Sequence, residues 1–210
     1  ASVGDAEVSI DDVVALQTGE EAVPGNTVRE QLTLWIKTAR LQQYTGSPVD
    51  AVLGSADAQA FDRLRGTLVE PAEAETQYSQ GTSGVVCPRA IPVAAAEDGA
   101  AALQSYESGV SFADVAAQYS NDPGIAGSGG ELTAIIGGEC VAPEGLNPDL
   151  VALLDEIPVG SVALRDISGG FLILQRKSFA ELSDGSQQQI AASLVTNDDL
   201  AAAFEDVQIT

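Results

Sequence analysis

The sequence contains no histidine and no methionine among its 210 residues. Without histidine, neither a Ser-His-Asp triad, a Cys-His pair nor a histidine-ligated metal centre can be built. A general base acting at neutral pH would have to be a carboxylate with a shifted pKa. The G-x-S-x-G, P-loop and S-x-x-K patterns are also absent. We therefore expect no metal, no cofactor and none of the common hydrolase mechanisms.

Basic residues are scarce, with 9 Lys and Arg against 31 Asp and Glu and a formal charge of −22. Because phosphate contacts need clustered Lys and Arg, nucleic acid and anionic membranes are not expected as main partners. No apolar run approaches the roughly 18 to 20 residues of a membrane-spanning helix. The acidic charge has two interpretations, a preference for basic or neutral partners and adaptation to salt or solubility.

The chain contains no methionine, even at position 1, which indicates either a processed chain or a trimmed one, and the interpretation we follow is removal of a secretory signal. This interpretation predicts an extracytoplasmic protein, whether secreted, periplasmic or at the cell surface. A lipid anchor upstream of the given sequence stays open. Two cysteines, Cys87 and Cys140, fit either one disulfide or two separate buried thiols, and the exported context favours the disulfide. Such a bond would close a loop of about 50 residues and contribute roughly 4 kcal/mol in the chain-entropy model.

Helices are expected in the first 80 residues. Ser9 and Asp12 indicate the start of a short helix that ends near Gly19. Thr27 and Glu30 form a capping-box pattern, and the apolar spacing that follows predicts a helix over about 27–44. Further helices are expected at about 55–66 and from Pro71 onward.

A polar turn at 80–84 separates these helices from a different pattern. The next 95 residues or so predict an α+β unit, because strand-like and helix-like segments alternate. The expected order is a strand at 85–93, a helix at 97–108, a helix capped by Ser111, a glycine loop at 124–130, a strand at 131–136, a helix from Asn147, and strands at 162–167 and 171–175. The tail predicts helices at 186–195 and from an Asn197 cap to Phe204, followed by a strand-like 207–210.

Residues 106–132 resemble the central signature of parvulin-type peptidyl-prolyl isomerases. That family has the pattern G-x-x-F-x-x-x-A-x-x-x-S-x-D followed by G-G-[DE]-L, and both parts occur here in order. Residues 157–162 and 170–174 are similar to two later motifs of the family. The resemblance implies a four-stranded antiparallel sheet with surrounding helices and a shallow groove for proline-containing peptides.

The same resemblance assigns roles to individual residues. The positions at which active parvulins carry two histidines are Ala90 and Leu172 here, and both are apolar. Asp122 occupies the acidic position of the central signature and is the candidate catalytic residue, although a turn-forming role explains it equally well. The groove is expected to be lined by apolar residues, namely Val141, Leu146 and Leu150.

The flanking segments 1–10 and 71–78 resemble the exported SurA-like and PrsA-like chaperones, in which a helical module carries an inserted parvulin domain. The resemblance implies a helical module formed by 1–83 and 180–210, with 84–179 as the insert. Three functions compete. The first is a chaperone or foldase-like protein that binds unfolded, extended or proline-containing polypeptide clients through the degenerate parvulin domain and the helical module. The others are a working isomerase with a histidine-free site and an adaptor or assembly subunit of an envelope complex. The first is favoured, because binding through apolar pockets survives the loss of catalytic side chains, and isomerase activity is expected to be weak or absent.

Overall fold

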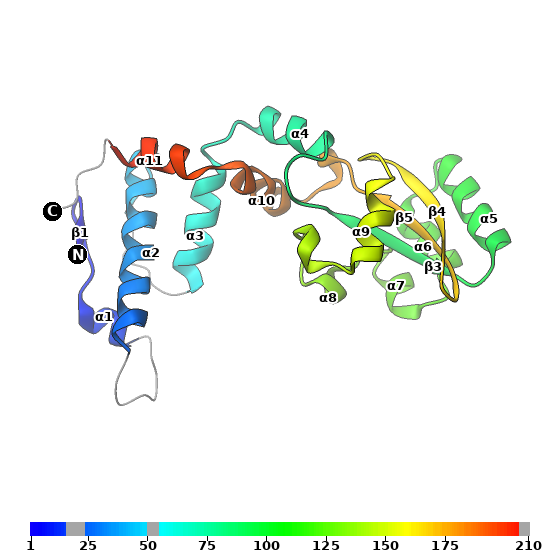
Figure 1. Ribbon diagram of the computed structural model, residues 1–210, viewed down its shortest axis with the longest axis horizontal. Helices are drawn as coiled ribbons and strands as arrows, with labels where there is room; N and C mark the ends of the chain where they lie inside the picture. The colour runs from blue at the N-terminus through cyan, green and yellow to red at the C-terminus, as the bar shows by residue number, and fades with distance from the viewer. Residues whose placement is uncertain (16–23, 50–54, 206–210) are drawn as a thin grey trace. The chain divides into compact units, whose positions relative to one another are not determined.

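The computed structural model describes residues 1–15, 24–49 and 55–205, in two compact units. One unit comprises Ala1–Pro71 with Ala191–Thr210, and the other comprises Ala72–Ile190 (Figure 1). The predicted boundaries at 84 and 179 lie inside the second unit. The expected helix end near Gly19 and the expected strand at 207–210 lie outside the described residues. No helix in the described ranges is both long and apolar enough to cross a membrane.

The first unit is mainly helical. A two-stranded antiparallel sheet of β1 and β2 precedes the helices. The elements of the first unit are β1 (Ser2–Val3), β2 (Ala6–Glu7), α1 (Ile10–Ala15), α2 (Gly25–Tyr44), α3 (Ser55–Gly66) and α11 (Asn197–Glu205). Trp35 of α2 is fully buried in a cluster with Val3, Val8 and Ala39. The guanidinium of Arg40 lies 4.7 Å from the ring centre of Phe204, so α11 packs against α2.

Local hydrogen bonds explain where helices of this unit begin. The predicted start of α1 is confirmed, because Ser9 N donates to the Asp12 carboxylate at 2.7 Å and Asp12 N donates to Ser9 Oγ at 3.2 Å. This reciprocal pair satisfies two of the free N–H groups at a helix start.

Two other predicted helix starts are wrong in detail. Helix α2 begins at Gly25, so Thr27 lies inside the helix and does not cap it. Helix α11 is capped by Thr196 and not by Asn197, since Thr196 Oγ donates to Asp199 at 2.7 Å and accepts from Asp199 N at 3.2 Å. Threonine and aspartate three residues apart form the stronger reciprocal cap, which shifts the cap by one residue.

The second unit is α+β. Its elements in chain order are α4 (Pro71–Ser79), β3 (Pro88–Val93), α5 (Ala96–Glu107), α6 (Phe112–Tyr119), α7 (Pro123–Gly127), α8 (Thr133–Ile136), η1 (Pro143–Gly145), α9 (Pro148–Asp155), β4 (Val162–Ile167), β5 (Gly170–Arg176), η2 (Phe179–Glu181) and α10 (Asp184–Leu194), which ends just beyond the unit.

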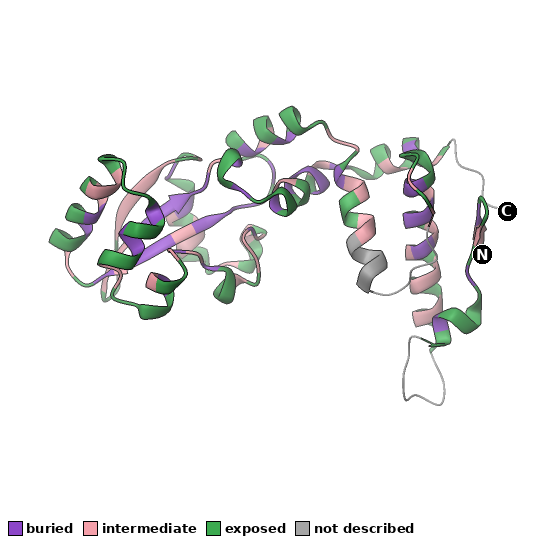
Figure 2. Ribbon diagram, turned by 180° about the vertical axis from the view of Figure 1, so that it is seen from behind, coloured by how far each residue is buried: buried purple, intermediate pink, exposed green. Residues whose placement is uncertain are grey.

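One antiparallel sheet with strand order β3-β5-β4 organises this unit. Alternate strand residues face opposite sides. Ile91 and Ile173 pack with Phe112 and Val115 on the side of α5 and α6. Ala90 and Leu174 pack on the other side, with Leu154 of α9. Figure 2 shows buried residues concentrated along β3 and β5.

The strand predicted at 131–136 is wrong. Only Glu131 pairs with the sheet, as an isolated bridge to Arg89, and Thr133–Ile136 form the helical turn α8. The sheet therefore has three strands within the described residues. Gly130 has φ 86° and lies so close to Phe112 that a Cβ would meet that ring at 2.6 Å. Because Gly130 and Gly137 both adopt left-handed φ, the segment between them turns too sharply for an extended strand.

The predicted glycine loop at 124–130 also contains structure. Its first residues form the short helix α7, which begins directly after Asp122. The Asp122 side chain accepts two backbone N–H bonds there, which stabilises a turn of helix despite the glycines.

Candidate functional site

A pocket of about 350 Å³ opens on one face of the β3-β5-β4 sheet. Its lining residues come from helices α7, α8 and α9, which we call its walls, from strands β3 and β5, which we call its floor, and from the loops beside them. Nine of the twelve lining residues carry apolar side chains, and Asp122 and Asn147 supply the polar ones. The lining residues are Ala90, Pro92, Asp122, Ile125, Leu132, Ile135, Ile136, Gly145, Leu146, Asn147, Leu150 and Leu172. We call this pocket the groove.

The two positions assigned to histidine in active parvulins lie together on the groove floor. Ala90 of β3 is opposite Leu174 of β5, and Leu172 of β5 is opposite Pro92 of β3. Ala90 and Leu172 are therefore diagonal neighbours on the same face of two paired strands. Both line the groove. The floor carries no titratable side chain at either position.

Asp122 lines the groove and also caps α7. Its Oδ1 accepts hydrogen bonds from Gly124 N at 2.7 Å and from Ile125 N at 3.1 Å. Ser120 Oγ accepts a further bond from Asp122 N at 3.2 Å. The two bonds to Oδ1 fix the orientation of the carboxylate. Capping of α7 is therefore a sufficient reason for an aspartate at position 122, without any catalytic role. A catalytic role for Asp122 stays a prediction.

The predicted groove residues fall into two groups. Leu146 and Leu150 line the groove, and their part in substrate binding stays a prediction. Val141 is not among the lining residues. Its N–H and C=O groups both pair with Val86, each bond at 2.9 Å, so Val141 joins its loop to the segment that leads into β3.

The lining residues of α8 were not expected from the sequence. Ile135 and Ile136 were assigned to a strand, but as part of a helical turn they reach the groove. Ile135 is 71% exposed, which is unusual for a large apolar side chain. The sequence did carry one signal for these residues, namely two adjacent isoleucines between two glycine pairs. A short turn of this kind has few neighbours to cover its apolar side chains, so it can expose them to a ligand.

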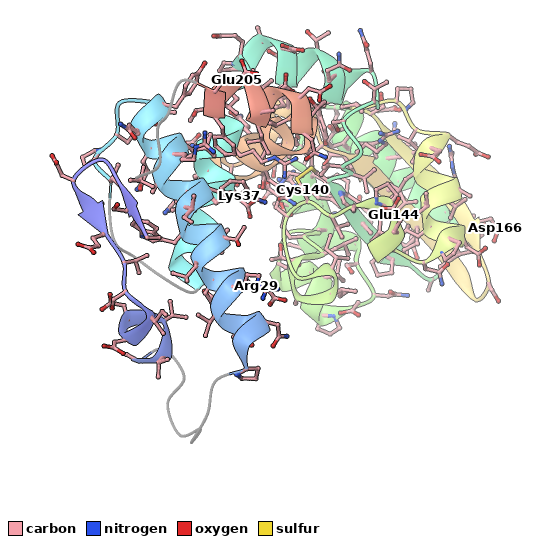
Figure 3. All side chains as sticks on the ribbon, turned by 60° about the vertical axis from the view of Figure 1, so that its left-hand side comes forward. Arg29, Lys37, Cys140, Glu144, Asp166 and Glu205 are labelled. Atoms are coloured by element: carbon pink, nitrogen blue, oxygen red, sulfur yellow. A yellow bond between two sulfur atoms is a disulfide. The ribbon has the colours of Figure 1, made fainter. Side chains whose placement is uncertain are left out.

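Cys87 and Cys140 form the predicted disulfide, which spans 53 residues of sequence (Figure 3). Both cysteines are buried. The bond lies beside the Val86–Val141 bridge, so it fixes the loop after α8 to the start of β3. The disulfide therefore supports the wall of the groove that α8 provides.

A buried lysine joins the same loop to the sheet. Lys177 follows β5, and its side chain is only 2% exposed. Its Nζ donates to Glu131 Oε1 at 3.0 Å and also contacts Glu139. Arg89 Nε donates to the same Glu131 oxygen at 2.6 Å. Because Glu131 and Glu139 flank α8, these ion pairs position α8 against the floor.

Glu139 has the most strongly perturbed carboxyl group of this network. Burial alone would raise its pKa, but hydrogen bonds from Lys177, Ser183 and Ser186 together lower the pKa to about 2. Ser183 Oγ and Ser186 Oγ donate to Glu139 Oε2 at 2.7 Å and 2.6 Å. These donors stabilise the charged form of the carboxylate.

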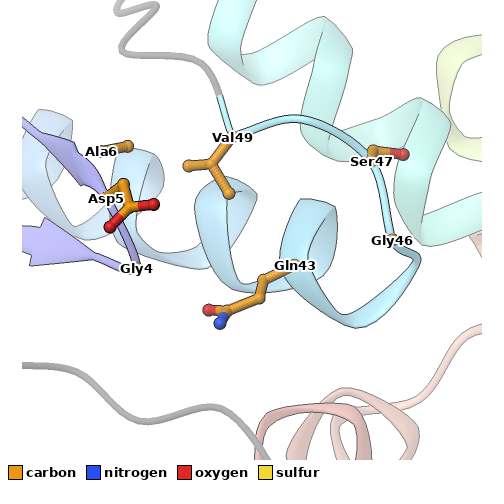
Figure 4. A pocket seen from close by; sticks show the side chains of 7 residues that line it. All are labelled: Gly4, Asp5, Ala6, Gln43, Gly46, Ser47 and Val49. Carbon is orange, nitrogen blue, oxygen red and sulfur yellow. The ribbon is translucent and has the colours of Figure 1, made fainter.

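Two other pockets carry no comparable constellation. One of about 400 Å³ in the first unit is lined by Gly4, Asp5, Ala6, Gln43, Gly46, Ser47 and Val49, with Asp5 as its one ionisable side chain (Figure 4). Another of about 540 Å³ lies beside α5 and α6, where Arg89 is already paired with Glu131. In the part of the chain that the structure describes, no three His, Cys, Asp or Glu residues are placed to hold a metal ion.

Comparison with known proteins gives remote structural similarities. No protein-family model and no curated protein matches the chain. PrsA from Bacillus subtilis is similar at 18% identity and a TM-score of 0.40, over 92% of this chain and 76% of that one. The peptidylprolyl isomerase PrsA from Bacillus anthracis has 13% identity and a TM-score of 0.38, with 97% and 92% covered. A SurA-like chaperone structure from Campylobacter jejuni has 15% identity and a TM-score of 0.37, with 96% and 92% covered.

Proposed function

We propose that this protein binds unfolded or extended polypeptide segments, including those that contain proline, in the groove. It acts as an exported chaperone of the foldase type whose parvulin-like unit has weak isomerase activity or none. The observation that carries the proposal is the composition of the groove, whose nine apolar side chains include Ala90 and Leu172 at the positions of the family's histidines.

The size and chemistry of the groove suit a short apolar segment. Its volume of about 350 Å³ lies in the lower part of the range of roughly 300 to 1,000 Å³ that is usual for ligand pockets. A proline ring or a leucine side chain gains free energy when it leaves water for such a lining. Recognition of this kind accepts many sequences, which is what a chaperone requires.

Isomerisation also requires polar groups that stabilise a twisted X-Pro amide, and the groove has few of them. An X-Pro amide must be twisted out of resonance, against a barrier of about 18 to 20 kcal/mol. The groove offers only two polar side chains, those of Asp122 and Asn147, and Asp122 Oδ1 already accepts two N–H bonds. The groove can therefore hold a prolyl segment but has few groups to stabilise the twisted amide.

We expect the cis-to-trans relaxation of a Leu-Pro peptide to be accelerated by less than about tenfold at micromolar protein. The measurement is a protease-coupled or fluorescence assay, with Asp122→Asn as the comparison. A large acceleration that Asp122→Asn removes would show that the groove is a working isomerase site, and it would reverse our assignment.

Replacing Ile135 by serine is expected to weaken peptide binding about tenfold. Burial of an isoleucine side chain contributes roughly 1.5 to 3 kcal/mol, and Ile135 is 71% exposed until a ligand covers it. For the same reason the substitution should leave the free energy of unfolding nearly unchanged. Fluorescence anisotropy of a labelled Leu-Pro-Phe peptide measures the affinity.

Ile10→Ser is the matched control. Ile10 is 62% exposed and lies on α1 of the first unit, outside the groove. The same chemical change at Ile10 should leave the peptide affinity unaltered. If Ile10→Ser and Ile135→Ser weaken binding equally, or neither does, the groove is not where the peptide binds.

A further inference from the structure

We propose that the groove selects client segments that carry a lysine or arginine next to the apolar or prolyl residue, and that the carboxylate of Asp122 makes this selection. The inference rests on the function proposed above. It adds a substrate class to that function and gives Asp122 a role in specificity.

The charge of the second unit supports this inference. Residues 72–190 contain four basic and sixteen acidic side chains, a formal charge of −12. None of the four basic residues lines the groove. A negative potential over an apolar pocket raises the local concentration of cationic ligands and slows the approach of anionic ones.

Internal partners already engage all four cations of this unit. The contacts are Arg89 Nε to Glu131 at 2.6 Å, Arg165 to Glu156 at 3.6 Å, Arg176 to the carbonyl oxygens of Ile157 at 3.2 Å and Leu154 at 3.4 Å, and Lys177 Nζ to Glu131 at 3.0 Å. The acidic groups at the groove therefore have no cation of this unit beside them.

Asp122 is placed to contact a ligand. Its Oδ1 is held by Gly124 N and Ile125 N, which sets the direction of the carboxylate. Its Oδ2 accepts no hydrogen bond and forms no ion pair with any described residue. Asp122 is exposed and belongs to the groove lining, so a bound segment passes beside an open carboxylate oxygen.

Two exposed acids that are sequence neighbours of lining residues add to the negative charge of this part of the unit. Glu144 directly precedes the lining residue Gly145 (Figure 3). Asp149 lies between the lining residues Asn147 and Leu150 in sequence. Neither forms an ion pair within the described part of the chain.

The test compares three peptides with a common Leu-Pro-Phe core. They differ only in the residue beside this core, which is Lys, Ala or Glu. For the unaltered protein we expect the Lys peptide to bind about tenfold more tightly than the Glu peptide in low salt. Because the charges are exposed, the ratio should shrink when the salt concentration is raised from 50 to 500 mM.

Asp122→Asn is the decisive variant. Asparagine caps helices about as well as aspartate, so α7 is retained while the negative charge is lost. We expect the Lys-to-Glu ratio to fall to threefold or less. Asp166→Asn on β4 removes one charge outside the groove lining and should leave the ratio near tenfold (Figure 3).

The outcomes separate this inference from the proposed function. Equal binding of all three peptides would overturn the selection while leaving the groove as a peptide site. An unchanged ratio in Asp122→Asn, or an equal fall in Asp166→Asn, would show that Asp122 is not the selecting group. If no peptide binds at all, the proposed function fails as well.

Discussion

Replacing both Cys87 and Cys140 by alanine is expected to lower the free energy of unfolding by about 4 kcal/mol. The disulfide closes a loop of 53 residues, and the chain-entropy model values such a loop at roughly 4 kcal/mol. Both cysteines are buried, so alanine also leaves some unfilled space. Urea unfolding followed by far-UV circular dichroism measures the difference.

The control uses a reductant. Reduction under denaturing conditions followed by refolding in the reductant should bring the unaltered protein to the stability of the alanine pair, and the alanine pair itself should not respond. Peptide affinity should fall in the same samples, because the disulfide fixes the loop after α8, and α8 contributes Ile135 to the groove. A stability difference below about 1 kcal/mol would contradict this account of the disulfide.

Glu139→Gln is expected to lower the free energy of unfolding by up to about 3 kcal/mol at pH 7. The pKa of Glu139 is lowered from 4.5 to about 2 in the folded protein, and each pKa unit corresponds to about 1.4 kcal/mol. The variant also leaves Lys177, whose side chain is 2% exposed, with Glu131 as its one remaining carboxylate partner among the described residues. Removing one member of a buried ion pair is usually strongly destabilising.

The pH dependence of this effect has a definite sign. A carboxyl group with a lowered pKa in the folded state contributes stability above its unfolded pKa, and it loses that contribution as the pH falls toward the folded pKa. The difference between the protein and Glu139→Gln should therefore be full at pH 7, begin to shrink near pH 4.5 and continue to shrink toward pH 2. Glu144→Gln is the control at an exposed residue, and its free energy of unfolding at pH 7 should stay close to that of the unaltered protein. A difference that does not vary between pH 7 and pH 3 would contradict the assignment.

Local signals in the sequence predicted most helix starts correctly. Ser111 caps α6, with Asp114 N donating to Ser111 Oγ at 3.1 Å. Asn147 caps α9, with Asp149 N donating to Asn147 Oδ1 at 2.8 Å. These bonds span two or three residues, so the pattern that predicts them is visible in the sequence itself.

The segment 131–136 shows where local reasoning fails. Threonine and two isoleucines favour a strand by propensity. The conformation is decided by the left-handed glycines on either side and by the contact of Gly130 with Phe112, both of which depend on tertiary packing. Because the segment was predicted as a strand, Ile135 and Ile136 were not predicted to line the groove.

The site was predictable only as far as the resemblance extends. It named Ala90 and Leu172, and both lie in the lining of one pocket together with Leu146 and Leu150. The Lys177 network was not predicted, because its partners lie 38 and 46 residues away in the sequence. Contacts over such distances follow from the fold and leave no local pattern.

The central claim is that the groove binds polypeptide, and an NMR titration tests it most directly. Uniformly ¹⁵N-labelled protein is titrated with the Lys-containing Leu-Pro-Phe peptide, and the amide shifts are mapped onto the chain. We expect the largest changes along the groove, in α7, in α8 and at the start of α9, together with Ala90 and Leu172. No change at millimolar peptide, or changes confined to residues outside the groove, would contradict the claim.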